Sequence, residues 1–171
     1  MTKKKSPVIS FEDFSFQYRA QKKPTLTGIN LNIYPGEKVL IAGPSGSGKS
    51  TLAGCINGLN PFSNPGESTG KLIVDGVDAM HSSIFELSAH VGTVLQDPDG
   101  QFIGLTVGED IAFALENGCT PQDKMHEITK HAAELVGIET HFDYAPHELS
   151  GGQKQRVRLA GVMVDEVTIL I

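Results

Sequence analysis

A glycine-rich segment containing one lysine has the residue types and spacing of a phosphate-binding loop. It runs Gly43-Pro44-Ser45-Gly46-Ser47-Gly48-Lys49-Ser50, which matches the pattern G-x-x-x-x-G-K-S/T. Glycines let successive backbone N–H groups converge on phosphate oxygens, because no Cβ stands in the way. Lys49 would bring positive charge to the terminal phosphates, and the Ser50 hydroxyl would reach a Mg²⁺ ion. We therefore predict that these residues, with Thr51, bind ATP and Mg²⁺.

The sequence on either side of this loop predicts a strand before it and a helix after it. Lys38 to Ala42 is a short apolar run, typical of a strand covered on both faces. Ser50 to Asn60 repeats apolar residues at helical spacing and should stop at Asn60-Pro61. Such a helix would direct its positive N-terminal end at a bound anion. The alternative is a glycine-rich turn that only links strand to helix.

A second segment, Leu149-Ser150-Gly151-Gly152-Gln153, precedes a basic stretch that is compatible with a helix. Ser150 can cap this helix, while the two glycines expose backbone N–H groups at its positive end. The segment is therefore a second candidate for an anion-binding helix terminus. Taken alone, it could also be an ordinary capped helix.

The two segments together resemble the nucleotide-binding subunits of ABC transporters, whose identifying pentapeptide is matched by Leu149 to Gln153. By this resemblance, Tyr18 corresponds to the aromatic residue that stacks on adenine. The alternative for Tyr18 is a strand aromatic packed in the core. Gln96 corresponds to the glutamine that approaches Mg²⁺ and the attacking water, and that reports to the membrane partner. The alternative for Gln96 is a polar residue that simply ends a strand.

A narrower resemblance comes from Val91 to Gln101 and from Leu105 to Phe113. These stretches are similar to the ATPases of energy-coupling factor (ECF) importers, which take up vitamins and transition-metal ions such as cobalt and nickel. The resemblance implies a transmembrane transporter subunit as partner, and a cytoplasmic location on the inner face of the cell membrane. It also implies two ATPase domains arranged head to tail, as a homodimer, a heterodimer or tandem halves. In that arrangement Ser150, Gly151, Gly152 and Gln153 of one domain face the γ-phosphate held by Lys49 of the other.

The fold class predicted from these motifs is α/β, a P-loop NTPase of the ABC ATPase type with an antiparallel N-terminal β element and a helical insert. We expect one domain, in which residues 1–96 form the β element and P-loop core, 97–148 a helical subdomain, and 149–171 the signature helix and the start of the Walker B strand. The predicted strands are Val8–Tyr18, Leu26–Tyr34, a hairpin around Asp75-Gly76, Val91–Leu95 and the run from Val167. Residues 61–70 have loop chemistry. The remaining predicted helices are Val107–Glu116, Gln122–Val136 and Gly151–Met163.

Composition excludes several other classes of protein. The net charge of −6 over 171 residues argues against a nucleic-acid partner, and no apolar window is long enough for a membrane span. Cys55 and Cys119 are 64 positions apart and have no zinc-ligand spacing. Two alternatives remain open. One is a soluble ABC-type ATPase that acts on ribosomes or DNA, and the other is a non-hydrolysing half that completes a partner's site.

Hydrolysis in this family needs an apolar strand that ends in Asp followed by a catalytic Glu. Asp165-Glu166 precedes the apolar run at Val167 instead of following it, so we reject this pair. We therefore expect these 171 residues to be the N-terminal part of a longer protein. We also expect them to bind nucleotide but to hydrolyse it poorly, because neither a general base nor a Mg²⁺-orienting Asp is present.

Overall fold

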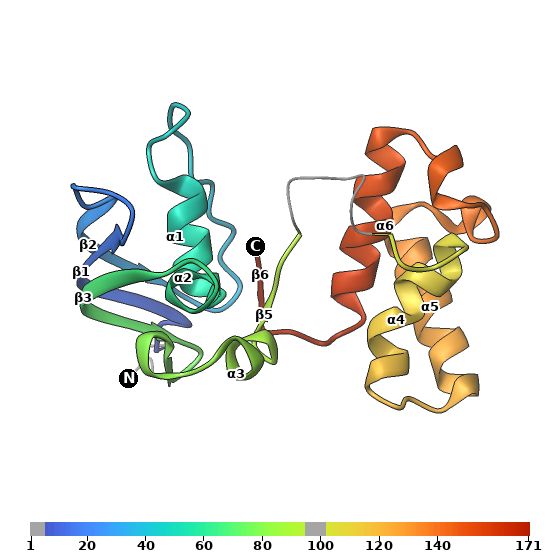
Figure 1. Ribbon diagram of the computed structural model, residues 1–171. Helices are drawn as coiled ribbons and strands as arrows, with labels where there is room; N and C mark the ends of the chain where they lie inside the picture. Colours follow the sequence, from blue (N-terminus) through green and yellow to red (C-terminus); the bar gives the residue numbers. More distant parts are fainter. Residues whose placement is uncertain (1–5, 95–101) are drawn as a thin grey trace. The chain divides into compact units, whose positions relative to one another are not determined.

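The structure is a computed structural model that describes residues 6–94 and 102–171. The chain forms two compact units, residues 1–91 and residues 92–171, and each is described here by itself (Figure 1). Gln96 lies outside the described residues. Within the described ranges, none of the helices combines the length and the apolar character needed to cross a membrane.

The first unit is built on a four-stranded sheet in the order β2-β1-β3-β4. Its strands are β1 (Ile9–Tyr18), β2 (Leu26–Ile33), β3 (Gly66–Val74) and β4 (Val77–Asp78). β1 pairs antiparallel with both β2 and β3, which confirms the predicted antiparallel N-terminal element (Figure 1). β3 and β4 form the predicted hairpin around Asp75-Gly76, where both turn residues have positive φ, as a two-residue hairpin turn requires.

A β-bulge in β1 lets one strand bury four aromatic or aliphatic side chains on the same face. Phe11 and Phe14 are both buried although they are three positions apart, because the pairing register shifts between them and Asp13 takes φ 46°. Gly70 of β3 lies opposite this bulge with φ 78°, and a Cβ there would collide with the Asp13 carbonyl. Glycine is therefore required at this position.

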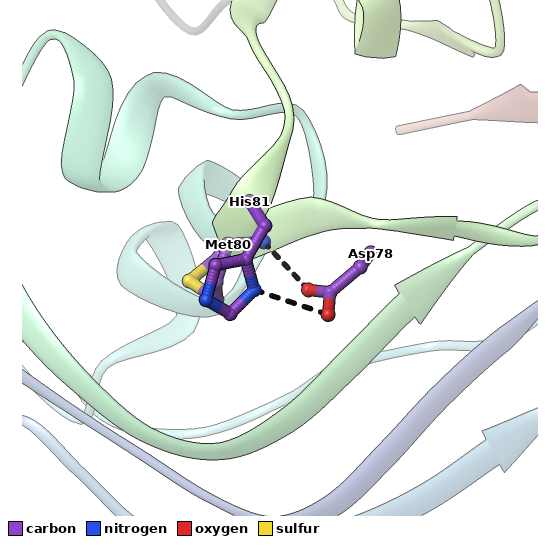
Figure 2. A network of polar contacts seen from close by, with 3 residues as sticks. All are labelled: Asp78, Met80 and His81. Atoms are coloured by element: carbon purple, nitrogen blue, oxygen red, sulfur yellow. Dashed lines mark hydrogen bonds and ion pairs between the residues drawn. The ribbon is translucent and has the colours of Figure 1, made fainter.

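Short helices complete the first unit: α1 (Lys49–Ile56), α2 (Leu59–Phe62), the 3-10 turn η1 (Ala79–His81) and α3 (Ile84–Ser88). The predicted helix from Ser50 to Asn60 is too long, because Gly58 adopts a left-handed conformation and breaks it. The predicted loop at 61–70 is also too long, since β3 already begins at Gly66. Asp78 caps η1 by accepting a hydrogen bond from Met80 N at 3.2 Å, and its other oxygen lies 3.1 Å from His81 Nδ1 (Figure 2).

The predicted strand from Lys38 to Ala42 is wrong. These residues are in no strand, and Val39, Leu40 and Ile41 are 48%, 90% and 42% exposed. An apolar run reports only side-chain character, whereas a strand also needs a neighbour to bond its N–H and C=O groups. None of the four strands described in this unit pairs with residues 38–42.

The second unit packs three helices around one apolar core. These are α4 (Val107–Asn117), α5 (Gln122–Val136) and α6 (Gly151–Met163), and they confirm the three predicted helices. The 3-10 turns η2 (Glu139–His141) and η3 (Pro146–Glu148) connect α5 to α6. All three helices contribute to the core, whose buried members include Val107, Ile111, Leu115, Ala132, Ala133, Ile138, Leu149, Val157, Ala160 and Val164.

A short two-stranded sheet joins β5 (Val91–Gly92) to β6 (Ile169–Leu170). Ile171 N donates to Gly92 O, and Val94 N donates to Ile171 O, which is the bonding pattern of parallel strands. Both strands were predicted to be longer. Leu95, the predicted end of the first one, lies outside the described residues.

Candidate functional site

The glycine-rich loop holds its shape through backbone conformations that favour glycine. Gly46 and Gly48 have φ angles of 79° and 92°, in the left-handed region where a Cβ is strained. Gly48 also packs tightly, because a Cβ there would lie 3.0 Å from Leu26 Cδ2 and 3.2 Å from Thr25 O. Ser47 N donates to Pro44 O at 3.3 Å and closes a turn within the loop. The loop therefore meets α1 at a position that a larger residue would disturb.

The ammonium group of Lys49 lies over this loop. Lys49 Nζ donates to Gly43 O at 3.0 Å and to Pro44 O at 2.8 Å. The loop from Gly43 to Ser47 is solvent-exposed, and so is Ser50. Lys49 thus brings a positive charge to an exposed loop, where a phosphate group could replace the two carbonyls as the partner of the ammonium group.

The N-terminus of α1 is open to an anion. Its N-cap, Gly48, supplies no side-chain hydrogen bond, and the first turn contains no acidic residue. The first N–H groups of a helix have no partner within the helix, and the helix dipole adds positive potential at this end. Together with the Lys49 ammonium and the exposed Ser50 hydroxyl, these groups fit a Mg²⁺-bound polyphosphate.

Tyr18 connects β1 to the helix that follows the loop. Its hydroxyl donates to Thr51 Oγ1 at 3.1 Å, and its ring packs edge-on against Phe16 with centroids 5.0 Å apart. Asn60, which is 1% exposed, donates from Nδ2 to Thr51 O at 3.1 Å and to the Tyr18 hydroxyl at 3.3 Å. These contacts place Tyr18 beside α1.

Cys55 lies in the same buried region. Burial raises the pKa of its thiol from an ordinary 9.0 to about 12, and a hydrogen bond from Asn60 opposes this shift. The second cysteine, Cys119, is exposed, and both thiols are free. Cys55 therefore stays protonated and unreactive at neutral pH.

The second motif is a fully formed capping box at the start of α6. Ser150 Oγ accepts from Gln153 N at 3.4 Å, and Gln153 Oε1 accepts from Ser150 N at 2.8 Å. Ser150, Gly151 and Gly152 are exposed, and a Cβ at either glycine would meet nothing within 4 Å. The start of α6 is therefore an accessible helix N-terminus, as predicted for an anion-facing segment.

With both motifs described, comparison with known proteins decides the family. The ABC transporter family matches residues 26–171. The chain belongs to the ABC transporter family. It carries the ATP-binding domain of that family, and the predicted fold class is confirmed.

Several relatives and one solved structure support this assignment. A protein of Clostridium perfringens named as an ABC transporter ATP-binding protein is 60% identical over 164 residues, which are 96% of this chain and 29% of that protein. A protein of the same description from Bacillus thuringiensis is 58% identical, with the same two shares. The solved structure of CbiO1 from C. perfringens, described as part of the ABC transporter complex CbiONQ, has a TM-score of 0.84 and 34% identity. The alignment covers 97% of this chain and 64% of CbiO1, so the chain spans less than two thirds of each of these proteins.

Two residues of this ABC ATPase domain that sequence reasoning did not assign have structural roles beside the motifs. The sequence indicated only that a helix stops at Asn60, before Pro61. It did not predict the contact between the Asn60 side chain and Thr51. His141 belongs to none of the predicted sites, yet its Nε2 lies 2.9 Å from Gln153 Nε2. Only the tertiary contacts identify these two positions.

Asp165 and Glu166 lie in the turn between α6 and β6. Glu166 has φ 48°, and partial burial raises the pKa of Asp165. Both residues precede β6 instead of following it. Among residues 6–94 and 102–171, no group of three or more His, Cys, Asp or Glu side chains gathers as a metal site would.

Proposed function

We propose that this ABC domain binds Mg²⁺-ATP at residues 43–51, with the phosphates on the loop and on the start of α1. The observation that carries the proposal is the uncapped N-terminus of α1 directly behind Gly48, with Lys49 at the loop carbonyls. When bound, Mg²⁺ would offset the negative charge of the phosphates. Ser50 and Gln96 of this domain are the proposed protein ligands of the Mg²⁺ ion. Tyr18 is proposed to stack on the adenine.

The signature segment is proposed to act on a second ATPase half. Ser150, Gly151, Gly152 and Gln153 would face the γ-phosphate held by the partner's loop, so that ATP joins the two halves. The exposed glycines at the start of α6 support this role, because the first N–H groups of a helix have no partner within the helix and lie at its positive end.

The length of the relatives suggests where that second half lies. The matched region is 29% of each curated relative but 64% of CbiO1, so each relative is a little more than twice as long as CbiO1. We infer that two ATPase halves share one polypeptide in these proteins. The proposed partner of this domain is then a homologous half of the same gene product.

The transport role follows from the similarity to CbiO1, which is part of an ABC transporter complex, and from the likeness of residues 91–113 to ECF importer ATPases. We propose that ATP hydrolysis drives uptake of a vitamin or a transition-metal ion through a transmembrane subunit. The ATPase would sit on the inner face of the membrane, with Gln96 reporting to that subunit. The catalytic carboxylate is proposed to come from residues outside these 171, because Asp165 and Glu166 do not follow a strand.

The test of nucleotide binding is Lys49→Ala in the complete gene product. Removal of this ammonium should weaken ATP binding at this site at least about tenfold, because charge-assisted bonds to phosphate are among the strongest in proteins. Binding is measured with a fluorescent ATP analogue by titration. Lys130→Ala, an exposed lysine on α5, is the matched control and should bind as the wild type does.

If Lys49→Ala binds ATP like the Lys130→Ala control, the loop is not the site and the proposal fails. Co-purification of the gene product with ribosomes or DNA, in place of a membrane protein, would overturn the transport role while leaving ATP binding intact.

A further inference from the structure

His141 lies at the end of η2, on a segment that is anchored to the core of the second unit. Its backbone N–H donates to Ile138 O at 2.9 Å, and its carbonyl accepts from Tyr144 N at 3.0 Å. Ile138 is completely buried among the core residues. The backbone that carries the imidazole is therefore fixed.

The imidazole has a partner at each nitrogen. Nε2 lies 2.9 Å from Gln153 Nε2 at the start of α6, and Nδ1 lies 2.9 Å from Thr140 Oγ1. The ring also packs edge-on against Tyr144, with centroids 5.0 Å apart. His141 thus contacts the last residue of the signature pentapeptide directly.

The chemistry of these partners selects one state of the ring. An amide nitrogen donates hydrogen bonds and does not accept them, so His141 Nε2 must be the unprotonated acceptor for Gln153. The ring proton is then on Nδ1, and it donates to Thr140 Oγ1. The bond at Gln153 therefore requires a neutral imidazole in the Nδ1–H form.

The orientation of the Gln153 amide is set by the cap of α6. Its Oε1 accepts from Ser150 N at 2.8 Å. Rotation of the amide by half a turn would face its NH₂ group toward Ser150 N–H, which would leave two donors opposed and break that part of the cap. One arrangement therefore satisfies both ends of Gln153, with the amide nitrogen toward His141 and the amide oxygen toward Ser150.

We propose that His141 is a positioning residue for the signature segment: its neutral imidazole orients Gln153, which in turn fixes Ser150 at the start of α6. This inference rests on the proposed function, in which Ser150 and Gly152 face the γ-phosphate held by the partner half. Ser150, Gly151 and Gly152 are exposed, and no side chain packs where a glycine Cβ would stand. Their position therefore depends on the capping box and on the residue that orients it.

A second contact ties the same segment to α6 one turn further along. Arg156 Nη1 donates to Gly137 O at 3.2 Å. Residues 137–144 are thus joined to α6 at Gln153 and at Arg156. Loss of the His141 bond should loosen the first turn of α6 without unfolding the helix.

The test uses His141→Leu and His141→Gln in the complete gene product, with ATP turnover as the readout. Leu fills the space but accepts no hydrogen bond, whereas the Gln side chain can place an oxygen near the former Nε2 position. His131→Leu, at an exposed histidine of α5, is the matched control. The activity that depends on the signature segment is defined as the part that Ser150→Arg removes.

We expect His141→Leu to lower this Ser150-dependent kcat on the order of fivefold, with the affinity for ATP unchanged, because the variant loses one hydrogen bond to Gln153 and the net effect of one such bond is typically of this order. His141→Gln should restore most of the loss, and His131→Leu should match the wild type. Nitrogen NMR of the imidazole in the wild type should show the proton on Nδ1.

Three outcomes would overturn the inference: His141→Leu with unchanged kcat, His141→Gln as impaired as His141→Leu, or a ring proton on Nε2. The failure of the proposed function itself looks different. In that case Ser150→Arg removes no activity, whatever the His141 variants do.

Discussion

At the scale of single residues, the phosphate loop depends on conformations that only a few positions supply. Gly48 combines φ 92° with close packing against Leu26 and Thr25, so a side chain there would be strained and also crowded. Lys49 and Ser50 are placed by this one glycine, since α1 begins immediately after it. We therefore expect phosphate binding by the loop to depend on Gly48 as strongly as on Lys49.

The two cysteines should differ sharply in reactivity. The Cys55 thiol has its pKa raised to about 12 by burial, so it stays protonated at pH 8, while Cys119 is exposed. Iodoacetamide should therefore modify one thiol of the native 171-residue chain and two in denaturant, as counted by mass spectrometry. Rapid modification of Cys55 in the native chain would contradict its burial.

The same pKa shift predicts how stability depends on pH. The folded-state pKa of the Cys55 thiol lies above the unfolded value of 9.0. The contribution of this thiol to the stability of the folded chain is therefore fully present below about pH 9. The contribution of Cys55 is then lost as the pH rises toward 12.

At the scale of elements, a buried polar network joins β1 to α1. Tyr18, Thr51 and Asn60 share hydrogen bonds, and Asn64 Nδ2 donates to Asn60 Oδ1 at 2.9 Å. Gly54 of α1 faces the Asn60 amide so closely that a Cβ would lie 2.5 Å from Nδ2. The network thus fixes α1, whose first N–H groups are proposed to bind phosphate, against β1, which carries the proposed adenine contact.

Replacement of Asn60 by Ala should destabilise the first unit. Its removal leaves the buried Thr51 carbonyl and the Tyr18 hydroxyl with fewer partners, which typically costs about 1–3 kcal/mol. Urea unfolding of the chain, followed by circular dichroism, measures the loss. Asn32→Ala, an exposed position of β2, is the control and should change the stability by less than about 0.5 kcal/mol.

Measurement of ATP affinity separates the proposed stacking role of Tyr18 from a purely structural role. Tyr18→Phe keeps a ring for stacking and loses the bond to Thr51. If Tyr18 stacks on adenine, Tyr18→Phe should retain ATP binding and Tyr18→Ala should lose it. Equal binding by both variants would leave Tyr18 as a support for α1 alone.

At the scale of the whole molecule, the two motifs belong to two separate units. The phosphate loop lies in residues 1–91, and the signature helix shares its core with α4 and α5 in residues 92–171. Each unit therefore carries one helix N-terminus that is proposed to face an anion. In the proposed site, the loop of one ATPase half and the signature segment of the other half face the same ATP.

The 171-residue chain should bind ATP but hydrolyse it far more slowly than the complete gene product. Hydrolysis needs a positioned water and a base in addition to phosphate contacts, and Asp165 and Glu166 precede β6 instead of following it. Phosphate release, normalised to bound nucleotide, compares the two proteins. Equal turnover, lost in Lys49→Ala, would show that the short chain contains a complete catalytic site.

The sequence alone determined the features that depend on local chemistry. The loop from Gly43 to Ser50, the capping box at Ser150 and Gln153, and the helices α4, α5 and α6 follow from residue type and spacing within a few turns of chain. The Asp75-Gly76 hairpin was predictable for the same reason. Two of them, the loop and the segment from Leu149 to Gln153, also carried the resemblance to ABC ATPases, which the comparisons confirmed.

Only the tertiary structure decided the features that need a distant partner. Residues 38–42 have the composition of a strand, yet they are in none, because a strand requires a neighbour that composition does not specify. Asn60 and His141 acquired their roles through bonds to Thr51 and Gln153, which are respectively nine and twelve positions away. Side-chain hydrogen bonds that form only on folding leave no periodic signal in the sequence, so the roles of these two residues are visible only in the folded chain.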